Sequence, residues 1–399
     1  MVKVTPLQLT LNLPTCDRAV TSIFVSPTIR SAHLDAAEVA WFAPLCNGDD
    51  RYLGRRDPLY ASNFRNASQI ARTADELGFR NMLLPSSYQP GLDTLTFAAA
   101  LAPQLRQMNL LAAIRCGETH PPMLARALAT LDHMLLGKLT VNIISSNLPG
   151  TELDSPARYR RSREVIQILQ QCWTREHLSF HGEFYDLELP TLPVRPYQTG
   201  GPLLYFGGYS PDGLDVGAEF CDVYLLWPDT EDKLAEHMHR MSSLAQERYD
   251  RAVDFGLRVH VVVRETEAEA RAAARELMRD VDAERGEEIR NAALDAKSYG
   301  VSLQSELRER SDDDGFVEDQ LWTGIGRARS GCGAAIVGDP DQVYAKLMSY
   351  HEMGFRSFIL SGYPHLEACE LFGRYVLPRM KTCSLLALYR PERNPLLRE

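Results

Sequence analysis

Several common signatures are missing from this sequence, and each absence removes a class of protein. The eight cysteines, at positions 16, 46, 116, 172, 221, 332, 369 and 383, form no C-x-x-C pair. Neither a zinc site nor a dithiol redox motif therefore has its required spacing. No G-x-S-x-G nucleophile elbow occurs, and no G-x-G-x-x-G turn follows the first predicted strand. These absences argue against an α/β-hydrolase and against an open dinucleotide-binding sheet.

The charge pattern and the length of the apolar runs exclude two further classes. The chain carries 53 acidic and 43 basic residues, a formal charge of -10, and has no basic cluster. Nucleic-acid binding needs a concentrated positive field, so we expect no nucleic-acid partner. No apolar run approaches the roughly 18 to 20 residues that span a bilayer. We expect a soluble cytoplasmic protein with no membrane contact, whose cysteines are mostly buried and reduced.

The histidines give no support for a metal site. His237 and His239 are two residues apart on a predicted helix and therefore do not share a face. We expect no metal.

What the sequence does contain is a repeated alternation of short apolar runs with amphipathic stretches, typical of βα units around a parallel sheet. The count favours a closed TIM (β/α)8 barrel over an open doubly wound sheet. Eight such runs predict strands at 39–44, 81–85, 110–114, 139–144, 203–206, 223–226, 257–263 and 357–360.

Other segments do not fit this repeat. We expect residues 1–36 to form an N-terminal extension, residues 37–380 to form the barrel and residues 381–399 to form a C-terminal tail. Alternating residues between 174 and 200 predict an inserted hairpin. The long polar connection over 280–335 is typical of a mobile lid or of disorder.

Polar residues that follow the predicted strands are the candidates for chemistry, because barrel enzymes place their sites at strand carboxyl ends. The last strand delivers Tyr363 and Pro364, which form either a plain turn or an acid/base-bearing element. His365 begins the next helix, and we interpret it as a capping or packing residue.

Two further strand ends offer binding groups, each with an alternative that the sequence leaves open. The turn Gly207-Gly208-Tyr209-Ser210 precedes a helix and resembles a phosphate cradle, although a tight βα turn fits equally well. Asn142, Ser145, Ser146 and Asn147 offer hydrogen bonds to a polyol or a heterocycle, or form an Asx-type turn.

Arginines supply the third set of candidates. Arg258 and His260 alternate on the seventh strand, so they point to the same side, and a solvent-accessible barrel mouth costs less than burial of the Arg258 charge. Arg327 and Arg329 lie in the glycine-rich part of the predicted lid, where either closes over an anion or remains a solvated surface charge.

Taken together, these runs resemble the bacterial-luciferase-like flavin monooxygenases, and most closely the FMNH2-dependent alkanesulfonate monooxygenases. The matching pieces keep the family order from about residue 39 to 378. They are Trp41-Phe42-Ala43-Pro44, Arg51-Tyr52-Leu53-Gly54, Ala129-Thr130-Leu131-Asp132, Tyr205-Phe206-Gly207-Gly208, residues 258–265, Leu321-Trp322-Thr323-Gly324, residues 335–339 and Ser361-Gly362-Tyr363-Pro364-His365.

The resemblance implies an enzyme with FMN, as FMNH2, for its cofactor and O2 for its co-substrate. It implies a two-component monooxygenase, acting through a flavin peroxide, with a separate NAD(P)H-dependent flavin reductase and a homodimeric or homotetrameric assembly. The implied catalytic set is Arg258, His260, Arg329 and Tyr363. The implied flavin-binding set is Asn142, Ser145, Ser146, Tyr159, Gly207, Gly208, Tyr209 and Ser210, and the implied substrate set is Phe42, Ser86 and Trp227.

Three departures from the sulfonate enzymes indicate a changed pocket on a conserved scaffold. Residues 86–93 lack the thiol that those enzymes carry after strand two, residues 45–49 replace a histidine-bearing loop, and Ser145-Ser146-Asn147 replaces Thr-Gly-Ser. The substrate is therefore an alkanesulfonate-like or a divergent small molecule. The alternatives are an F420-dependent oxidoreductase of the same barrel and a non-catalytic flavin-binding relative.

Overall fold

The computed structural model describes residues 27–46, 49–55, 57–60, 62–87, 91–191, 195–281, 284, 286–288, 298–329 and 331–389. Within these residues, eight parallel strands close into a barrel, because β13 pairs both with β9 and with β1. The predicted TIM barrel is confirmed, and each predicted strand overlaps an observed one. In barrel order these are β1 (Glu38–Phe42), β2 (Asn81–Leu84), β3 (Asn109–Arg115), β4 (Leu139–Ile144), β7 (Leu203–Phe206), β8 (Val223–Leu226), β9 (Asp254–Val263) and β13 (Phe355–Ser361).

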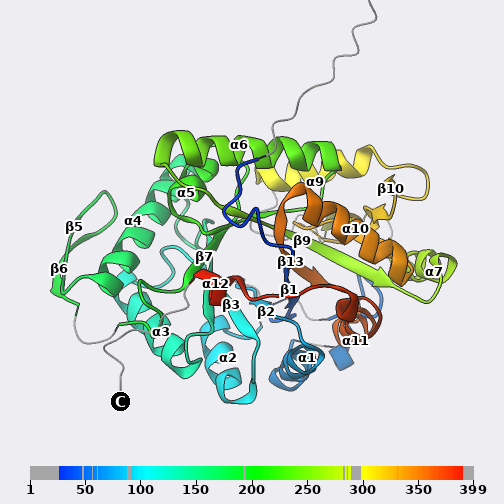
Figure 1. The fold of residues 1–399 in the computed structure, drawn as a ribbon, viewed down its shortest axis with the longest axis horizontal. Coiled ribbons are helices and arrows are strands. Elements are labelled where there is room, and N and C mark those ends of the chain that lie inside the picture. Colours follow the sequence, from blue (N-terminus) through cyan, green and yellow to red (C-terminus); the bar gives the residue numbers. More distant parts are fainter. Residues whose placement is uncertain are drawn as a thin grey trace, which may run out of the picture.

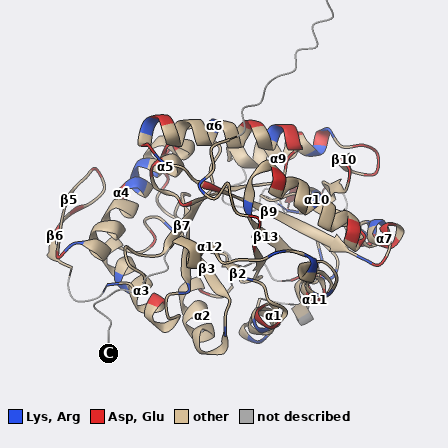
Figure 2. Ribbon diagram, viewed as in Figure 1, with Lys and Arg blue, Asp and Glu red and all other residues tan. Residues whose placement is uncertain are grey.

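Helices surround these strands (Figure 1) and carry most of the charged residues on the outside (Figure 2). The first begins where the Asn63 side chain accepts from the Asn66 backbone N–H, and it ends at Gly78 with φ 94°. The ring contains α1 (Phe64–Leu77), α2 (Thr94–Leu101), α3 (Pro121–Met134), α4 (Ser155–Thr174), α5 (Pro211–Phe220), α6 (Glu231–Tyr249), α7 (Glu267–Leu277), α10 (Pro340–Met353) and α11 (His365–Tyr375). Short 3-10 turns are η1 (Pro58–Tyr60), η2 (Ala102–Gln104) and η4 (Leu377–Arg379).

Strand β9 is longer than its neighbours, and all ten of its residues are buried. It begins at Asp254, three residues before the predicted start, and its first half pairs with β8. Its second half pairs with β12 (Ala335–Gly338), which the strand prediction did not include. The barrel wall therefore extends beyond the closed ring on this side.

The two insertions have the following structure. The hairpin region holds the antiparallel strands β5 (His177–His181) and β6 (Asp186–Pro190), and the region predicted as a lid holds α9 (Tyr299–Glu309), β10 (Phe316–Glu318), β11 (Leu321–Trp322) and η3 (Gly324–Arg327). Residues 282–283, 285, 289–297 and 330 of the second insertion lie outside the described residues. The mobility of this segment stays a prediction.

Both ends of the chain are described only in part. Residues 1–26 of the predicted extension and 390–399 of the predicted tail lie outside the described residues. Residues 385–389 form α12, which packs on the barrel interior at the amino ends of the strands. Among the described helices, none combines the length and the apolarity that crossing a membrane requires.

The floor of the barrel is organised around one buried carboxyl group. Glu38 is fully buried, and its Oε1 accepts from the Tyr205 hydroxyl at 2.6 Å and from Asn81 Nδ2 at 3.1 Å. Its Oε2 accepts from the Leu385 backbone N–H at 3.2 Å, which ties α12 to the floor. Burial raises the pKa of Glu38, and these hydrogen bonds oppose the rise.

Removing this acceptor should destabilise the fold. We expect Glu38→Ala to lower the free energy of unfolding by about 2–4 kcal/mol, because three buried donors lose their partner. Glu38→Gln keeps one acceptor oxygen and should cost less, and Glu370→Ala on the exposed face of α11 should change it by under about 0.5 kcal/mol. Urea unfolding followed by fluorescence measures all three, and similar values for Glu38→Ala and Glu370→Ala would contradict the assignment.

Candidate active site

Strands β9 and β13 lie side by side in the barrel wall (Figure 1) and bring the predicted catalytic groups together. Their parallel register sets His260 beside Ser361 and Arg258 beside Ile359. Because side chains alternate along a strand, Arg258 and His260 share one face. The carboxyl end of β13 then delivers Tyr363, whose ring stacks on His260 with centroids 5.5 Å apart and an interplanar angle of 25°.

Ser361 connects Arg258 to His260 by two hydrogen bonds. Arg258 Nη2 donates to Ser361 Oγ at 2.8 Å, and Ser361 Oγ lies 2.7 Å from His260 Nδ1. A guanidinium can only donate, and within the described residues the hydroxyl proton has no other acceptor than Nδ1. We therefore assign the imidazole proton of His260 to Nε2. The sequence analysis did not include Ser361 among the site residues, although it lies in the quoted motif.

The prediction that Arg258 is solvent-accessible is wrong. The residue is only 8% exposed, and its Cζ lies 4.6 Å from the centroid of the Phe42 ring. Its Nη1 donates to the backbone carbonyls of Val259 and Ile359 at 3.1 and 3.4 Å, which are neutral acceptors. Burial lowers the pKa of Arg258. The barrel therefore holds a buried cation that is hydrogen-bonded but not neutralised.

Arg329 adds a second cation at the same place. Its Cζ lies 5.5 Å from the centroid of the Tyr363 ring, and within the described residues its guanidinium has no hydrogen-bond or ion-pair partner. Burial and then the charge of Arg258 lower the pKa of Arg329. The Tyr363 hydroxyl is buried and likewise has no hydrogen-bond partner. The structure thus brings all four predicted catalytic residues together, and among them the Arg329 guanidinium and the Tyr363 hydroxyl have unfilled donor positions within the described residues.

A second imidazole lies beside this group. Asp49, from the loop after β1, and His365, at the start of α11, form a buried pair with an Oδ1 to Nδ1 distance of 2.7 Å. The His365 ring is 4.9 Å from the Tyr363 ring and 5.8 Å from the Phe42 ring, measured between centroids. The two partners are 316 residues apart in the sequence, and no local pattern connects them.

Strand β4 and the loop after it hold three of the predicted flavin-binding residues. Asn142, Ser145 and Ser146 are all partly exposed, and Ser145 Oγ is a buried atom without a hydrogen-bond partner. Arg115, at the end of β3, donates from Nη1 to Ser146 Oγ and from Nη2 to the Ser86 carbonyl at 2.7 Å. Arg115, which joins the loops after β2 and β4, is not among the residues predicted from the sequence.

The turn between β7 and α5 has the shape of a cradle that side chains would fill. A Cβ atom on Gly207 would lie 2.9 Å from the Leu225 carbonyl oxygen, and one on Gly208 would lie 3.0 Å from the Tyr159 hydroxyl. Tyr159 of α4 therefore reaches this turn, as predicted. Ser210 caps α5 by accepting from the Gly213 backbone N–H at 3.2 Å, and its own proton stays available to an anion. These glycines are required for space rather than for a positive φ.

Tyr209 and Trp227 fix the wall next to this turn. The Tyr209 hydroxyl accepts from the Trp227 backbone N–H at 2.6 Å, and burial raises the pKa of Tyr209. The Trp227 ring packs close to Gly300 of α9 and to Gly331, so the insertion contacts the barrel here. Of the predicted substrate residues, Phe42 lies under Arg258, whereas the Ser86 carbonyl binds Arg115.

Cys46 brings a thiol to the position where the departure from the sulfonate enzymes was noted. Its Sγ lies 3.4 Å from the carbonyl oxygen of Pro85, directly after β2. Burial raises the pKa of Cys46 to about 11, so the thiol is protonated at neutral pH. A thiol is thus present at the end of β2, but it comes from the loop after β1.

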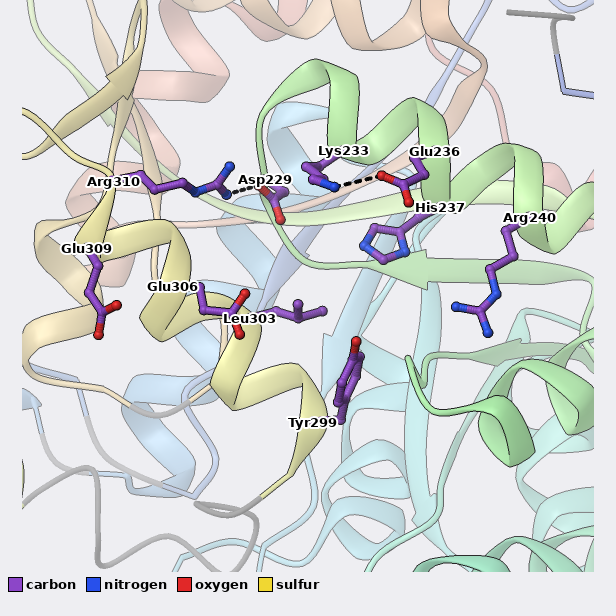
Figure 3. Close-up of a pocket in the computed structure, with 10 residues that line it drawn as sticks. All are labelled: Asp229, Lys233, Glu236, His237, Arg240, Tyr299, Leu303, Glu306, Glu309 and Arg310. Atoms are coloured by element: carbon purple, nitrogen blue, oxygen red, sulfur yellow. Dashed lines mark hydrogen bonds and ion pairs between the residues drawn. The ribbon is translucent and has the colours of Figure 1, made fainter.

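A cavity of about 560 Å³ lies elsewhere, between α6 and α9 (Figure 3). Two ion pairs cross its lining, Lys233 with Glu236 and Arg310 with Asp229, both at 2.8 Å. It is lined mainly by charged side chains and includes none of the predicted site residues. We therefore place the active site at the barrel mouth and not in this cavity.

Comparison with known proteins agrees with the fold. The family model described as luciferase-like monooxygenase matches residues 37–357. A sulfoquinovose monooxygenase of Agrobacterium fabrum is 56% identical over 363 residues, 90% of this chain and 94% of that protein. One of Novosphingobium aromaticivorans is 51% identical over 350 residues, 86% and 96% of the two chains.

Among solved structures, the oxygenating constituent of 3,6-diketocamphane monooxygenase from Pseudomonas putida, in complex with FMN, has a TM-score of 0.64 at 18% identity. The match covers 87% of this chain and 100% of that one. The chain belongs to the luciferase-like monooxygenase family, which confirms the resemblance seen in the sequence. It is a monooxygenase.

The buried imidazole of His260 should make stability depend on pH. Burial, followed by the charges of Arg258 and Arg329, lowers the pKa of His260 well below its usual value. The contribution of the neutral His260 ring to the free energy of unfolding is therefore fully present above the unfolded pKa of about 6.5. It is lost as the pH falls below that value. The stability advantage of the native protein over His260→Gln should shrink between about pH 7.5 and about pH 5. Urea unfolding across this range tests it, and parallel curves would show that the pKa is not lowered.

Proposed function

We propose that the protein is the oxygenase of a two-component system that uses FMNH2 and O2 to cleave the C–S bond of a sulfonated sugar, with sulfoquinovose as its substrate. The two relatives of that name cover 94% and 96% of their own lengths in the match, which supports this choice over a simple alkanesulfonate. A separate NAD(P)H-dependent flavin reductase supplies the FMNH2, and the protein acts as a homodimer or homotetramer.

The observation that carries the proposal is a pair of guanidinium groups, one buried and one partly buried, that no carboxylate of the described residues contacts by a hydrogen bond or an ion pair. Asp50 and Asp49 act on Arg329 only at longer range, and the pKa of Arg329 is still lowered. Arg258 donates only to carbonyls and to a hydroxyl, and Arg329 has no polar partner in the described part of the chain. The positive charge of one guanidinium disfavours the charged form of the other, because the charge of Arg258 lowers the pKa of Arg329. A bound sulfonate offers three acceptor oxygens and a negative charge, so it relieves both the repulsion and the unmet donors.

The described residues also fit FMN. The glycine turn after β7, with Ser210 and the Tyr159 hydroxyl, would hold the phosphate, because backbone can approach an anion only where no Cβ intervenes. The unpartnered Ser145 Oγ, together with Asn142 and Ser146, would hold the edge of the flavin. When bound, the reduced flavin supplies the electrons that activate O2.

We assign roles to His260 and Tyr363 from the positions of their protons, and to the predicted substrate residues from their packing. His260 carries its proton on Nε2, because Ser361 occupies Nδ1, and the Cys332 backbone also hydrogen-bonds the ring. The unpartnered hydroxyl of Tyr363 donates or relays a proton next to it. Phe42, Ser86 and Trp227 shape the space around the substrate, and Phe42 also shields the Arg258 guanidinium from water.

F420-dependent enzymes share this barrel, so the choice of cofactor needs a direct test. The purified protein is mixed anaerobically with FMNH2 or with reduced F420, and O2 is added with sulfoquinovose or with methanesulfonate. We expect sulfite only with FMNH2, in an amount matching the flavin oxidised, and much faster with the sugar. Absence of FMNH2 binding, or sulfite from neither sulfonate, would refute the proposal.

Substitution of Arg329, the more exposed of the two arginines, tests the proposed anion site. Arg329→Ala removes a charged contact worth about 1.5–3 kcal/mol and should lower kcat/KM roughly 10- to 100-fold. It should not lower the melting temperature, because it also removes the repulsion with Arg258. Arg329→Lys should recover part of this loss, because the charge remains. Arg327→Ala, two residues away and exposed, is the matched control. Equal kcat/KM values for Arg327→Ala and Arg329→Ala would remove Arg329 from the site.

A further inference from the structure

The Asp49–His365 pair contains more contacts than helix capping needs. Asp49 accepts the backbone N–H of His365 with both carboxylate oxygens, at 2.8 and 3.0 Å, and thereby caps α11. This cap uses only the backbone, so a residue with an apolar side chain at position 365 would preserve it. The third contact, from Asp49 Oδ1 to His365 Nδ1 at 2.7 Å, fixes the imidazole itself.

That third contact determines which ring nitrogen exchanges a proton. An ionised carboxylate can only accept, so His365 Nδ1 carries a proton and donates it to Asp49. In the neutral ring, His365 Nε2 is then the nitrogen without a proton, and it is buried without a hydrogen-bond partner in the described residues. His260 has the opposite arrangement, because Ser361 donates to its Nδ1 and its proton is on Nε2.

The two imidazoles flank one phenol. The Tyr363 ring stacks on His260 and meets His365 edge to face, and Phe42 separates His365 from the Arg258 guanidinium. The site therefore presents one imidazole as a donor and another as an acceptor, on either side of Tyr363. A donor suits an anionic oxygen of the substrate, and an acceptor suits a hydroxyl group that must be deprotonated.

Such a hydroxyl arises in the reaction proposed above, on which this inference rests. Oxygen insertion at the sulfonated carbon gives R–CH(OH)–SO3⁻, while O2 and FMNH2 leave as FMN and water. The hydroxyl proton must then depart, the C=O bond forms and the C–S bond breaks, with sulfite taking the bonding electron pair. The products are the aldehyde R–CHO, sulfite and one proton, so atoms and charge balance.

We propose that His365 is the base that takes this proton on Nε2, and that Asp49 is a positioning residue that holds the required tautomer. The assignment gives a function to a residue that the sequence pattern presents only as the first residue of a helix. It also explains why the buried Nε2 lacks a protein partner at the barrel mouth.

His351 supplies a matched comparison. Its Nε2 is also buried without a partner, but it lies near the carboxyl end of α10, where its backbone carbonyl accepts from Arg356 at the start of β13. That position is at the opposite end of the barrel from the strand carboxyl ends. A buried unpartnered imidazole nitrogen is therefore not sufficient for the role, and position together with a carboxylate on Nδ1 distinguishes His365.

The first arm of the test reads the tautomers directly by 15N NMR of the full-length protein with labelled histidine, without flavin or substrate. Signals are assigned by their loss in His365→Asn and His260→Gln. We expect a protonated Nδ1 in His365 and a protonated Nε2 in His260. Asp49→Asn should shift the His365 proton to Nε2, because the side-chain amide can donate to Nδ1. A protonated Nε2 in the native protein, with Nδ1 bare, would overturn the pairing.

The second arm compares flavin oxidation with sulfite release in a single turnover with sulfoquinovose. In the native protein and in His351→Asn, sulfite should appear in step with flavin oxidation. In His365→Asn and Asp49→Asn, flavin oxidation should proceed normally while sulfite lags by about 10²- to 10⁴-fold, the usual contribution of a general base. The lag should shorten as the pH of the solution rises, because hydroxide replaces the missing base.

Each outcome decides between the claims. Sulfite in step with flavin oxidation in His365→Asn would overturn the role of His365 and leave the proposed function intact. No sulfite from the native protein would refute the proposed function and with it the role of the base, whatever the NMR arm shows about the Asp49–His365 pair. A purely structural role predicts slower flavin oxidation and slower sulfite release together, without a lag.

Discussion

The parallel pairing of β9 with β13 is the constraint on which the rest of the site depends. It fixes His260 beside Ser361, and this pairing allows one hydroxyl to join Arg258 to His260. A shift by one residue would turn the inward side chains toward the helices, because the side-chain period of a strand is two. The ladder extends over six residue pairs, and both strands are buried along their whole length. The backbone of the barrel therefore sets the tautomer of an imidazole at its mouth.

Charge is distributed unevenly between the two ends of the barrel interior. At the floor, Glu38 is surrounded by donors from β2, β7 and α12, which stabilise the fold. At the mouth, Arg258 and Arg329 lie close together, and Arg258 is bound by neutral groups. The carboxylates of Asp50 and Asp49 raise the pKa of Arg329, but burial and the charge of Arg258 outweigh them and lower it. A protein keeps such an arrangement at a cost in stability, and an anionic substrate offsets that cost. The hydrogen bonds of Glu38 stabilise the fold, whereas Arg258 and Arg329 are placed to bind an anionic ligand.

The sequence predicts the parts of this structure that depend on local patterns. Buried parallel strands appear as short apolar runs, so all eight barrel strands were located. Strand β12 was missed as a strand because four residues at the end of a long polar insertion give little signal. The start of β9 was placed three residues late, since Asp254 and Gly256 interrupt its apolar run.

For the site, the family resemblance supplied the residues, and the structure supplied their partners. Arg258, His260, Arg329 and Tyr363 were predicted, but the burial of Arg258 was not, because the Ile359 carbonyl and the Ser361 hydroxyl that bind it come from another strand. The same reason applies to Asp49 with His365 and to Cys46 with Pro85, which meet only after the barrel closes. Contacts between distant segments have no local sequence signal.

The central claim, that an unneutralised arginine pair selects a sulfonated sugar, is tested most directly by anaerobic equilibrium titration of the FMNH2-loaded protein. Sulfoquinovose is compared with glucose, which has a hydroxyl group in place of the sulfonate. A charged contact to each guanidinium predicts at least about 100-fold tighter binding of the sulfonated sugar. Equal affinity for the two sugars would contradict the account.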